Sequence, residues 1–268
     1  MPAVTEQLIS SDRGAAQLSR LGVERGGVLL VHTSMRSVGG DAGTMVEALR
    51  QALGPEGTLV VPSFTTENSD TSPPYLDRVR GLSDEARAAV RAAMPPFDRA
   101  TSPATGMGLL AETVRLSPGA ERSAHPQTSF SAIGPAAGRL LARHSPDCHL
   151  GENSPLARMY EANARILLLG TGFGTCTAFH LAEYRRPDPP RRLYRCVIAP
   201  GGRRQWWEYE DVALDDSDFP ALGRDFERTD SSGAVRSGPV GSAQSRLIRL
   251  TSAVDFAVGW FKNHRAHS

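Results

Sequence analysis

The stretch ILLLGTGFGTCTAFHLAEYR, residues 166–185, decides the fold class of this chain. A short apolar run ends in three alternating glycines, and the helical pattern that follows carries Thr177, His180 and Glu183. An apolar run, a glycine turn and a helix predict a strand-to-helix connection in an α/β sheet. Such sheets bind ligands at the edge where these connections lie, so we expect the three side chains near a functional site.

The spacing of these three residues favours proton transfer. On a helix, His180 neighbours both Thr177, three residues before it, and Glu183, three residues after it. An imidazole takes up and releases protons near neutral pH, which makes His180 the candidate base. The pattern is also typical of a close-packed turn without catalysis. The glycines read G-x-G-x-G and not the G-x-G-x-x-G of dinucleotide-binding proteins.

Strand and helix patterns alternate along the chain. Apolar strands are predicted at 28–32 and 57–62, with a helix at 44–53 between them, which implies a parallel crossover. The other predicted helices are 5–21, 84–93, 107–116, 135–143 and 253–263, and the other strands are 130–133, 192–198 and 203–209. Without a repeat or linker, residues 1–268 are expected to form one α/β domain, a layered sandwich whose mixed, largely parallel central sheet is flanked by helices. The polar segment at about 63–103 is expected to be a loop on the substrate side.

Composition narrows the class of protein. The 268 residues are 40% hydrophobic and 22% charged, as in ordinary soluble proteins. A net charge of +1 argues against a nucleic-acid partner. Cys148, Cys176 and Cys196 lack CxxC spacing, which argues against a disulfide framework or a zinc site and fits a reducing cytoplasm. The N-terminal residues lack a signal pattern and no apolar run approaches 18 residues, so we expect neither secretion nor a membrane partner.

Two further segments carry possible binding groups. The loop at 32–40 presents hydroxyls and the Arg36 guanidinium, which suit a phosphate or a pantetheine amide, although polar loops often bind nothing. The segment between Glu208 and Asp218 holds six carboxylates among aromatic residues. Such a run is usually a solvated surface, but aromatic walls beside carboxylates also suit a polycationic, sugar-like ligand. A third segment, RSAHPQTSF at 122–130, predicts a turn before a strand.

These segments occur together and in order in one known family. The stretches LLVHTSMRSVGG (29–40), GAERSAHPQTSFSAIGPAA (119–137), LLLGTGFGTCTAFHLAEYR (167–185) and GPVGSAQSRLI (238–248) resemble the aminoglycoside 3-N-acetyltransferases. The resemblance extends from about residue 18 to 261. It implies a fold distinct from the GNAT acetyltransferases and direct acetyl transfer from acetyl-coenzyme A, the co-substrate, to the 3-amino group of a 2-deoxystreptamine ring. Antibiotic resistance is the role that such chemistry implies.

The resemblance also implies roles for particular residues. It makes His180 the general base, Thr177 a hydroxyl near the thioester, and Glu210 or Asp211 the carboxylate that orients the imidazole. The expected contacts with coenzyme A are Ser34, Met35, Arg36, Ser37, Val38, Ser129 and Phe130. The candidates for binding the cationic sugar are acidic: Glu67, Asp70, Glu183, Glu208, Glu210, Asp211 and the remaining acids up to Asp218. No metal is implied, and the expected assembly is a monomer or a homodimer.

Other interpretations stay open at this point. A Ser-His-acid hydrolase would use Ser34 or Ser129 with His180, although the chain lacks a G-x-S-x-G motif. A polyamine- or sugar-binding module would keep the acidic and aromatic residues and need no catalytic histidine. Two alternatives within acetyl transfer also stay open. The substrate is an amine other than an aminoglycoside, or Cys176 carries the acetyl group covalently in place of direct attack.

Overall fold

The structure, a computed structural model, describes residues 10–265 and is built on one seven-stranded sheet. The strands lie in the order β3-β4-β2-β1-β5-β9-β8, and a separate hairpin is formed by β6 and β7. Their bounds are β1 Val28–Thr33, β2 Thr58–Pro62, β3 Glu121–Arg122, β4 Phe130–Ile133, β5 Arg165–Leu169, β6 Arg191–Ile198, β7 Gln205–Val212, β8 Val235–Val240 and β9 Ala243–Arg249.

The three central strands are parallel and buried on both faces. Strand β1 pairs in parallel with β2 on one side and β5 on the other, so Leu30 lies opposite both Val60 and Ile166. The strands outside this centre, β4 with β3 and β9 with β8, run antiparallel. Continuous apolar runs are typical of parallel strands covered on both faces, and the mixed sheet expected from the sequence is confirmed.

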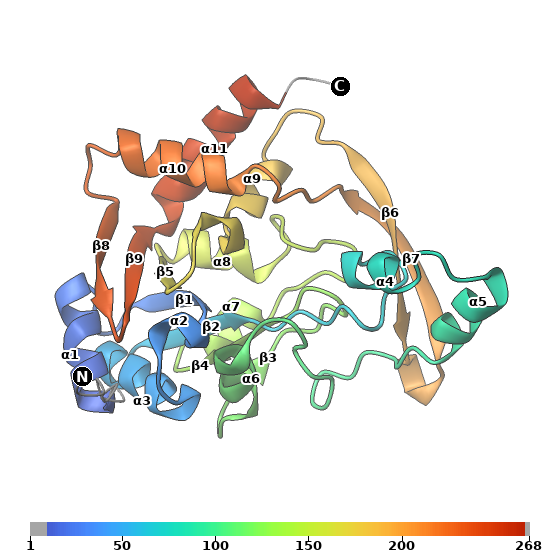
Figure 1. The fold of residues 1–268 in the computed structure, drawn as a ribbon, viewed down its shortest axis with the longest axis horizontal. Helices are drawn as coiled ribbons and strands as arrows, with labels where there is room; N and C mark the ends of the chain where they lie inside the picture. Colours follow the sequence, from blue (N-terminus) through green and yellow to red (C-terminus); the bar gives the residue numbers. More distant parts are fainter. Residues whose placement is uncertain (1–9, 266–268) are drawn as a thin grey trace, which may run out of the picture.

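Helices cover both faces of the sheet, in three layers (Figure 1). Helices α1, α3 and α6 pack on the face that carries Leu29 and Leu167, while α7, α8, α9, α10 and α11 enclose the core on the face of Leu30 and Ile166. The bounds are α1 Ser11–Leu21, α2 Met35–Val38, α3 Ala42–Leu53, α4 Pro73–Arg78, α5 Asp84–Ala92, α6 Leu109–Leu116, α7 Ala137–Leu141, α8 Pro155–Glu161, α9 Phe179–Tyr184, α10 Phe219–Thr229 and α11 Leu250–His264. Within residues 10–265, every helix is too short or too polar to cross a bilayer.

Capping residues set where the first helices begin. Asp41 accepts a hydrogen bond from the Thr44 N–H at 2.8 Å, which starts α3 at Ala42. Ser10 caps α1 in the same way, at 3.4 Å from the Arg13 N–H. The first predicted helix begins earlier, at residue 5, but residues 5–9 lie outside the described residues.

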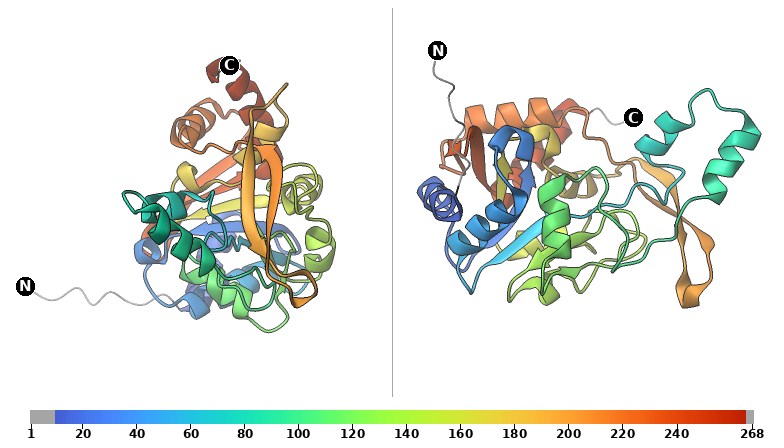
Figure 2. Two further views of the ribbon diagram at one scale, coloured as in Figure 1. Left: turned by 90° about the vertical axis from the view of Figure 1, so that its right-hand side faces the viewer. Right: turned by 60° about the horizontal axis from the view of Figure 1, so that its bottom comes forward.

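The hairpin and the segment at 63–103 form an arm beside the sheet (Figure 2). Helices α4 and α5 lie in this segment, so the predicted loop is partly helical, and α5 confirms the predicted helix at 84–93. Backbone hydrogen bonds join segment and hairpin, because the Val197 N–H donates to the Asn68 carbonyl at 2.7 Å and the Phe97 N–H donates to the Val197 carbonyl at 3.0 Å. Both ends of the segment return to the sheet at one edge, where the candidate site lies.

Candidate active site

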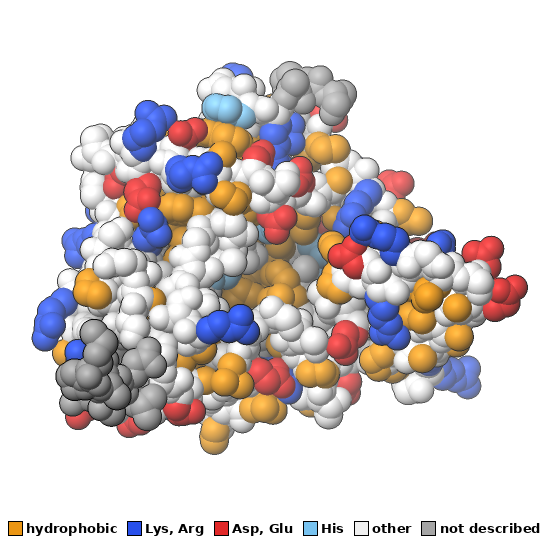
Figure 3. All heavy atoms as spheres, in the orientation of Figure 1, with side chains coloured by type: hydrophobic (Ala, Val, Ile, Leu, Met, Phe, Trp, Pro, Cys, Tyr) orange, Lys and Arg blue, Asp and Glu red, His pale blue; other side chains and the backbone are white. Residues whose placement is uncertain are grey.

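A cleft of about 340 Å³ lies at the carboxyl ends of the parallel strands. Its lining includes the last residues of β1, Pro62 at the end of β2, Phe64 after that strand, and residues between β5 and α9. Figure 3 shows a hollow with an apolar floor and histidine side chains within it at the centre of the molecule. This is the edge of an α/β sheet where ligands bind, as the sequence pattern predicts.

The turn after β5 brings the cleft residues together. Gly170 has φ +66°, and a Cβ there would lie only 3.0–3.1 Å from Ala243, Ser37 and Val38, so glycine is required both by its backbone and by its neighbours. A short 3₁₀ turn, Phe173–Thr175, follows, and α9 begins only at Phe179. Thr177 therefore lies before α9, although the sequence pattern places it on the helix. Its side chain still lines the cleft.

His180 forms a hydrogen-bonded pair with Glu183. The distance from Nδ1 of His180 to Oε2 of Glu183 is 2.6 Å, and the Glu183 side chain is only 1% exposed. The other carboxylate oxygen, Oε1, accepts from the Asp215 N–H at 3.1 Å and from Arg265. A fixed carboxylate orients an imidazole and stabilises its protonated form, and it leaves Nε2 of His180 as the nitrogen available for a substrate.

This geometry corrects the role that the resemblance implies for Glu210 and Asp211. Asp211 is 2% exposed and accepts from the His149 N–H at 2.7 Å and from the Tyr184 hydroxyl, while burial raises its pKa. Glu210 is exposed on the hairpin. The carboxylate that orients His180 is Glu183, which lies three residues further along the same helix. Glu183 is buried in this pair, so its carboxylate is not exposed to bind the sugar either.

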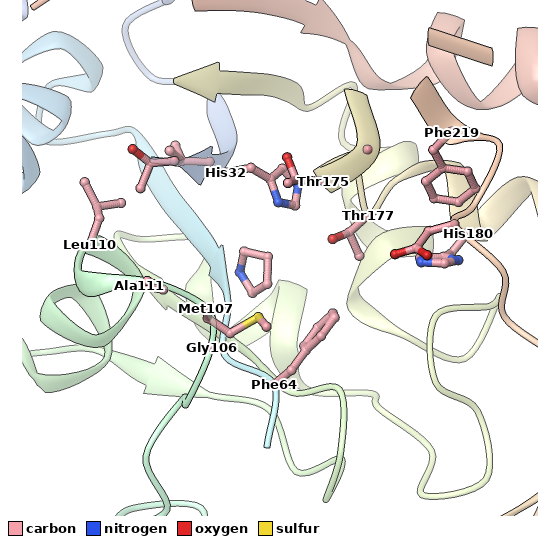
Figure 4. A pocket seen from close by; sticks show the side chains of 16 residues that line it. His32, Phe64, Gly106, Met107, Leu110, Ala111, Thr175, Thr177, His180 and Phe219 are labelled. Atoms are coloured by element: carbon pink, nitrogen blue, oxygen red, sulfur yellow. The ribbon is translucent and has the colours of Figure 1, made fainter. Parts of the chain in front are cut away.

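His32 is a second imidazole in the cleft, and sequence reasoning missed its place there. It lies at the end of β1, is 7% exposed, and its Nε2 is buried without a hydrogen-bond partner among the described residues. Burial and, to a smaller extent, the charge of His180 lower the pKa of His32 to about 3. In the view of Figure 4, Thr177 lies between the two imidazoles. The signal in the sequence was a polar residue at the carboxyl end of a buried strand.

The predicted coenzyme A segment lies beside this cleft. Residues Met35–Val38 form the one-turn helix α2 directly after β1, and Ser34 precedes it. The hydroxyls of Ser34 and Ser37 are 3.0 Å apart, and Arg36 and Ser37 are exposed. Val38 is instead 1% exposed and belongs to the core. Four of the five residues therefore keep accessible side chains.

Ser129 and Phe130 do not fit the predicted contact with coenzyme A. Both are fully buried. The Ser129 hydroxyl donates to the Ser63 carbonyl at 2.7 Å, and the Phe130 ring packs edge-on against Phe64 at 5.7 Å. Phe130, the first residue of β4, supports the cleft residue Phe64 from behind, and Ser129, the residue before β4, holds the neighbouring backbone at Ser63.

The predicted acidic cluster is divided among different partners. Asp70 is buried and pairs with Arg195, whose guanidinium also lies 3.2 Å from Glu208. Glu67 is exposed. Asp216 is exposed, lines the cleft, and has no salt-bridge partner within residues 10–265. It is the acidic residue among those that line the cleft.

Cys176 is fully buried next to Thr177. Burial raises the pKa of its thiol to about 12, so it is protonated at neutral pH. In the described part of the chain, no three His, Cys, Asp or Glu side chains are grouped to hold a metal ion.

Comparisons with known proteins identify the family of this chain. The model of the family described as aminoglycoside 3-N-acetyltransferase matches residues 30–262. The chain is 37% identical to the SPbeta prophage-derived aminoglycoside N(3')-acetyltransferase-like protein YokD of Bacillus subtilis, over 97% of this chain and 93% of the relative. It is 34% identical to aminoglycoside N(3)-acetyltransferase VIII of Streptomyces fradiae, over 95% of this chain and 92% of that enzyme.

Solved structures give the same result. The crystal structure of YokD superposes with a TM-score of 0.88 at 35% identity and covers 97% of this chain and 96% of its own. AAC-VIa bound to sisomicin has a TM-score of 0.83 at 31% identity, covering 98% and 100%. AAC-IIIb in a binary complex with CoASH has a TM-score of 0.80 at 29% identity, covering 96% and 97%. The chain therefore belongs to the aminoglycoside 3-N-acetyltransferase family of acyltransferases.

Proposed function

We propose that this protein transfers the acetyl group of acetyl-coenzyme A directly to the 3-amino group of the 2-deoxystreptamine ring of an aminoglycoside, with His180 as general base. The observation that carries the proposal is the His180–Glu183 pair, 2.6 Å apart, facing a cleft at the carboxyl ends of the parallel strands. The relatives that bind sisomicin and CoASH support the two substrate classes.

The chemistry needs one proton acceptor. The nitrogen of the neutral amine attacks the thioester carbonyl carbon while Nε2 of His180 takes one of its protons. The resulting oxyanion collapses, the carbon–sulfur bond breaks, and the proton passes from His180 to the sulfur of coenzyme A. Glu183 holds the Nδ1–H during both transfers, so the imidazolium is stabilised in each.

The two imidazoles of the cleft are unequal candidates for this base. His32 has its pKa lowered to about 3 by burial and by His180, so it is a weak proton acceptor and stays neutral at the pH of the cell. His180 has a buried carboxylate partner, which His32 lacks among the described residues. This difference supports His180 as the base.

The remaining groups fit the two substrates. The Thr177 hydroxyl lies in the cleft wall and is the donor that we propose for the oxyanion. The accessible residues Ser34 to Ser37 would contact coenzyme A, and Asp216 would meet an ammonium group of the sugar. Antibiotic resistance follows where the natural amine is an aminoglycoside, and the cytoplasm, where acetyl-coenzyme A and the ribosomal target of these drugs meet, is the compartment we propose.

Thiol release from acetyl-coenzyme A tests the proposal. Release should require an amine, and NMR of the product with gentamicin, kanamycin, apramycin and neomycin should place the acetyl group on the 3-amine. Release without any amine would indicate a hydrolase instead. Acetylation at another position, or of none of the four, would assign the cleft to a different amine, and an absence of thiol release with every amine would favour a binding module.

A further inference from the structure

Arg265, the residue after α11, joins three parts of the active-site region through one guanidinium. Its Nε and Nη2 donate to the two carboxylate oxygens of Asp218 at 2.8 and 2.6 Å. Nη2 also donates to the Asp215 carbonyl at 2.6 Å, and Nη1 donates to Oε1 of Glu183. The guanidinium lies 4.0 Å from the centre of the Phe261 ring, and its side chain is 13% exposed.

These contacts complete the hydrogen bonding of Glu183. One carboxylate oxygen faces His180, and the other is shared by the Asp215 N–H and Arg265. Because the Glu183 side chain is 1% exposed, an ionised carboxylate there needs a nearby cation as well as hydrogen bonds. Arg265 supplies that cation from the opposite side to the imidazole.

The same guanidinium fixes a segment of the cleft wall. Residues 215–218 are held at both ends, at the Asp215 carbonyl and the Asp218 carboxylate. Between these anchors lies Asp216, and Phe219 follows directly, and both line the cleft. The Phe219 ring is 4.7 Å from the His180 ring. A shift of Arg265 would therefore move the partner of the base and the wall beside the base together.

We propose that Arg265 is a positioning residue for acetyl transfer, which acts through Glu183 by fixing the carboxylate that orients His180. The inference rests on the proposed function, in which His180 is the base. It assigns a role in the active site to the end of α11, a region in which the sequence pattern indicates only a terminal helix.

The test is the Arg265→Gln variant, assayed for kcat, for both KM values and for the pH profile of kcat. We expect kcat to fall about 10- to 100-fold, because small displacements of catalytic groups have effects of this size. The KM for acetyl-coenzyme A should change by less than about threefold. The acid limb of the kcat profile should move to lower pH, since a Glu183 carboxylate that is no longer held in place stabilises the imidazolium less.

Arg185→Gln is the matched control. Arg185 is the residue after α9, and its guanidinium pairs with Glu152 at 2.7 Å; among the described residues this guanidinium makes no hydrogen bond or ion pair with the Glu183 carboxylate. The Arg185→Gln substitution should lower the thermal stability and leave kcat and the pH profile unchanged. An Arg265→Gln enzyme that loses stability to the same extent, yet keeps a normal kcat and acid limb, would overturn the proposal.

A double-mutant cycle keeps the test decisive if Arg265→Gln is poorly stable. With Glu183→Gln as the second variant, an effect through Glu183 requires that adding Arg265→Gln lowers kcat by less than about threefold further. If the loss of kcat in the double variant equals the product of the losses in the two single variants, the proposal is overturned. The His180→Ala variant distinguishes a failure of the proposed function from a failure of this inference. Full activity of His180→Ala would reject the proposed mechanism. Normal activity of Arg265→Gln together with an inactive His180→Ala would reject this inference alone.

Discussion

Two regions of this molecule place histidines in contrasting surroundings. In the cleft, His180 lines the cavity and pairs with the Glu183 carboxylate. Beneath the hairpin, the three-histidine cluster of His125, His144 and His149 is buried, with the His125 ring centre 4.7 Å from each of the other two. Burial lowers the pKa of His144 to about 4 and those of His125 and His149 well below their usual range.

Hydrogen bonds to His125 require that its ring is neutral. Nδ1 of His125 accepts the Gln127 and Thr128 N–H groups at 3.1 and 3.0 Å, so it carries no proton. His144 bonds to the Ser123 hydroxyl and the His149 carbonyl. These rings thus tie the turn before β4 to the loop before α8. The comparison teaches that a carboxylate partner and access to a cleft, rather than the imidazole itself, distinguish a proton-transfer group from a structural one.

The largest effect should follow from removing the cleft imidazole. We expect His180→Ala to lower kcat by about 100-fold or more with acetyl-coenzyme A binding largely intact, because loss of a general base typically costs 10²- to 10⁴-fold. Steady-state kinetics and coenzyme A titration measure the two effects. His144→Gln is the comparison: it should keep kcat per folded molecule. Similar losses in both variants would remove the distinction between the regions.

The cluster should appear in the pH dependence of stability. The unfolded chain binds protons at these histidines near pH 6.5, whereas the folded chain binds them only at lower pH, so stability is present above about pH 6.5 and is lost as the pH falls towards 4. For His144 alone the loss is about 3 kcal/mol. Urea unfolding between pH 7.5 and 4 measures it.

Substitution of one histidine tests whether the cluster causes this pH dependence of stability. His144→Gln should reduce the slope of unfolding free energy by about one proton, or about 1.4 kcal/mol per pH unit. His264→Gln, at an exposed histidine on α11, should leave it unchanged. A wild-type stability that is flat between pH 7 and 5 would contradict the assignment of neutral, buried rings.

The sheet was predictable where patterns are local. The apolar runs of β1, β2 and β5 and the glycine turn at Gly170 fix parallel strands and the ligand edge. Strands β8 and β9 were not predicted, because β8 reads VRSGPV, with a glycine and a proline, and gains its strand conformation from pairing with β9 and packing on α1. Helix α10, which begins directly after the acidic segment, was not predicted, although Phe219, Leu222 and Phe226 bury one of its faces.

The site was predictable where its residues are close in sequence. The local pattern selected Thr177, His180 and Glu183 as candidates, and the structure pairs His180 with Glu183 and places Thr177 in the cleft wall. The resemblance alone suggested Asp211, and the structure places it against Tyr184. His32 and Arg265 reach the site from β1 and the end of α11, at distances in the sequence that no local pattern spans.

A smaller effect should distinguish the acids of the two regions. Asp216→Asn removes the exposed carboxylate of the cleft, and we expect the KM for the aminoglycoside to rise about three- to tenfold with kcat little changed. The wild-type KM should also rise with ionic strength, since salt screens exposed charges beyond about 8–10 Å. Glu210→Gln, an exposed acid of the hairpin that does not line the cleft, is the control. An equal effect in both variants would mean that only overall charge attracts the substrate.

The smallest effect should come from Cys176, which extends the comparison to a thiol. Cys176 adjoins Thr177, yet it is fully buried, like the three-histidine cluster. Burial raises the pKa of its thiol to about 12, so the reactive thiolate is scarce at neutral pH. Direct transfer through His180 needs no thiol. We expect Cys176→Ala to keep kcat within about threefold and to cost on the order of 1 kcal/mol of stability, from the small void that it leaves. Mass spectrometry of enzyme quenched during turnover should find Cys176 unmodified. An acetylated Cys176 that passes its acetyl group to the amine would show that burial does not silence this thiol, and would replace direct attack by a covalent mechanism.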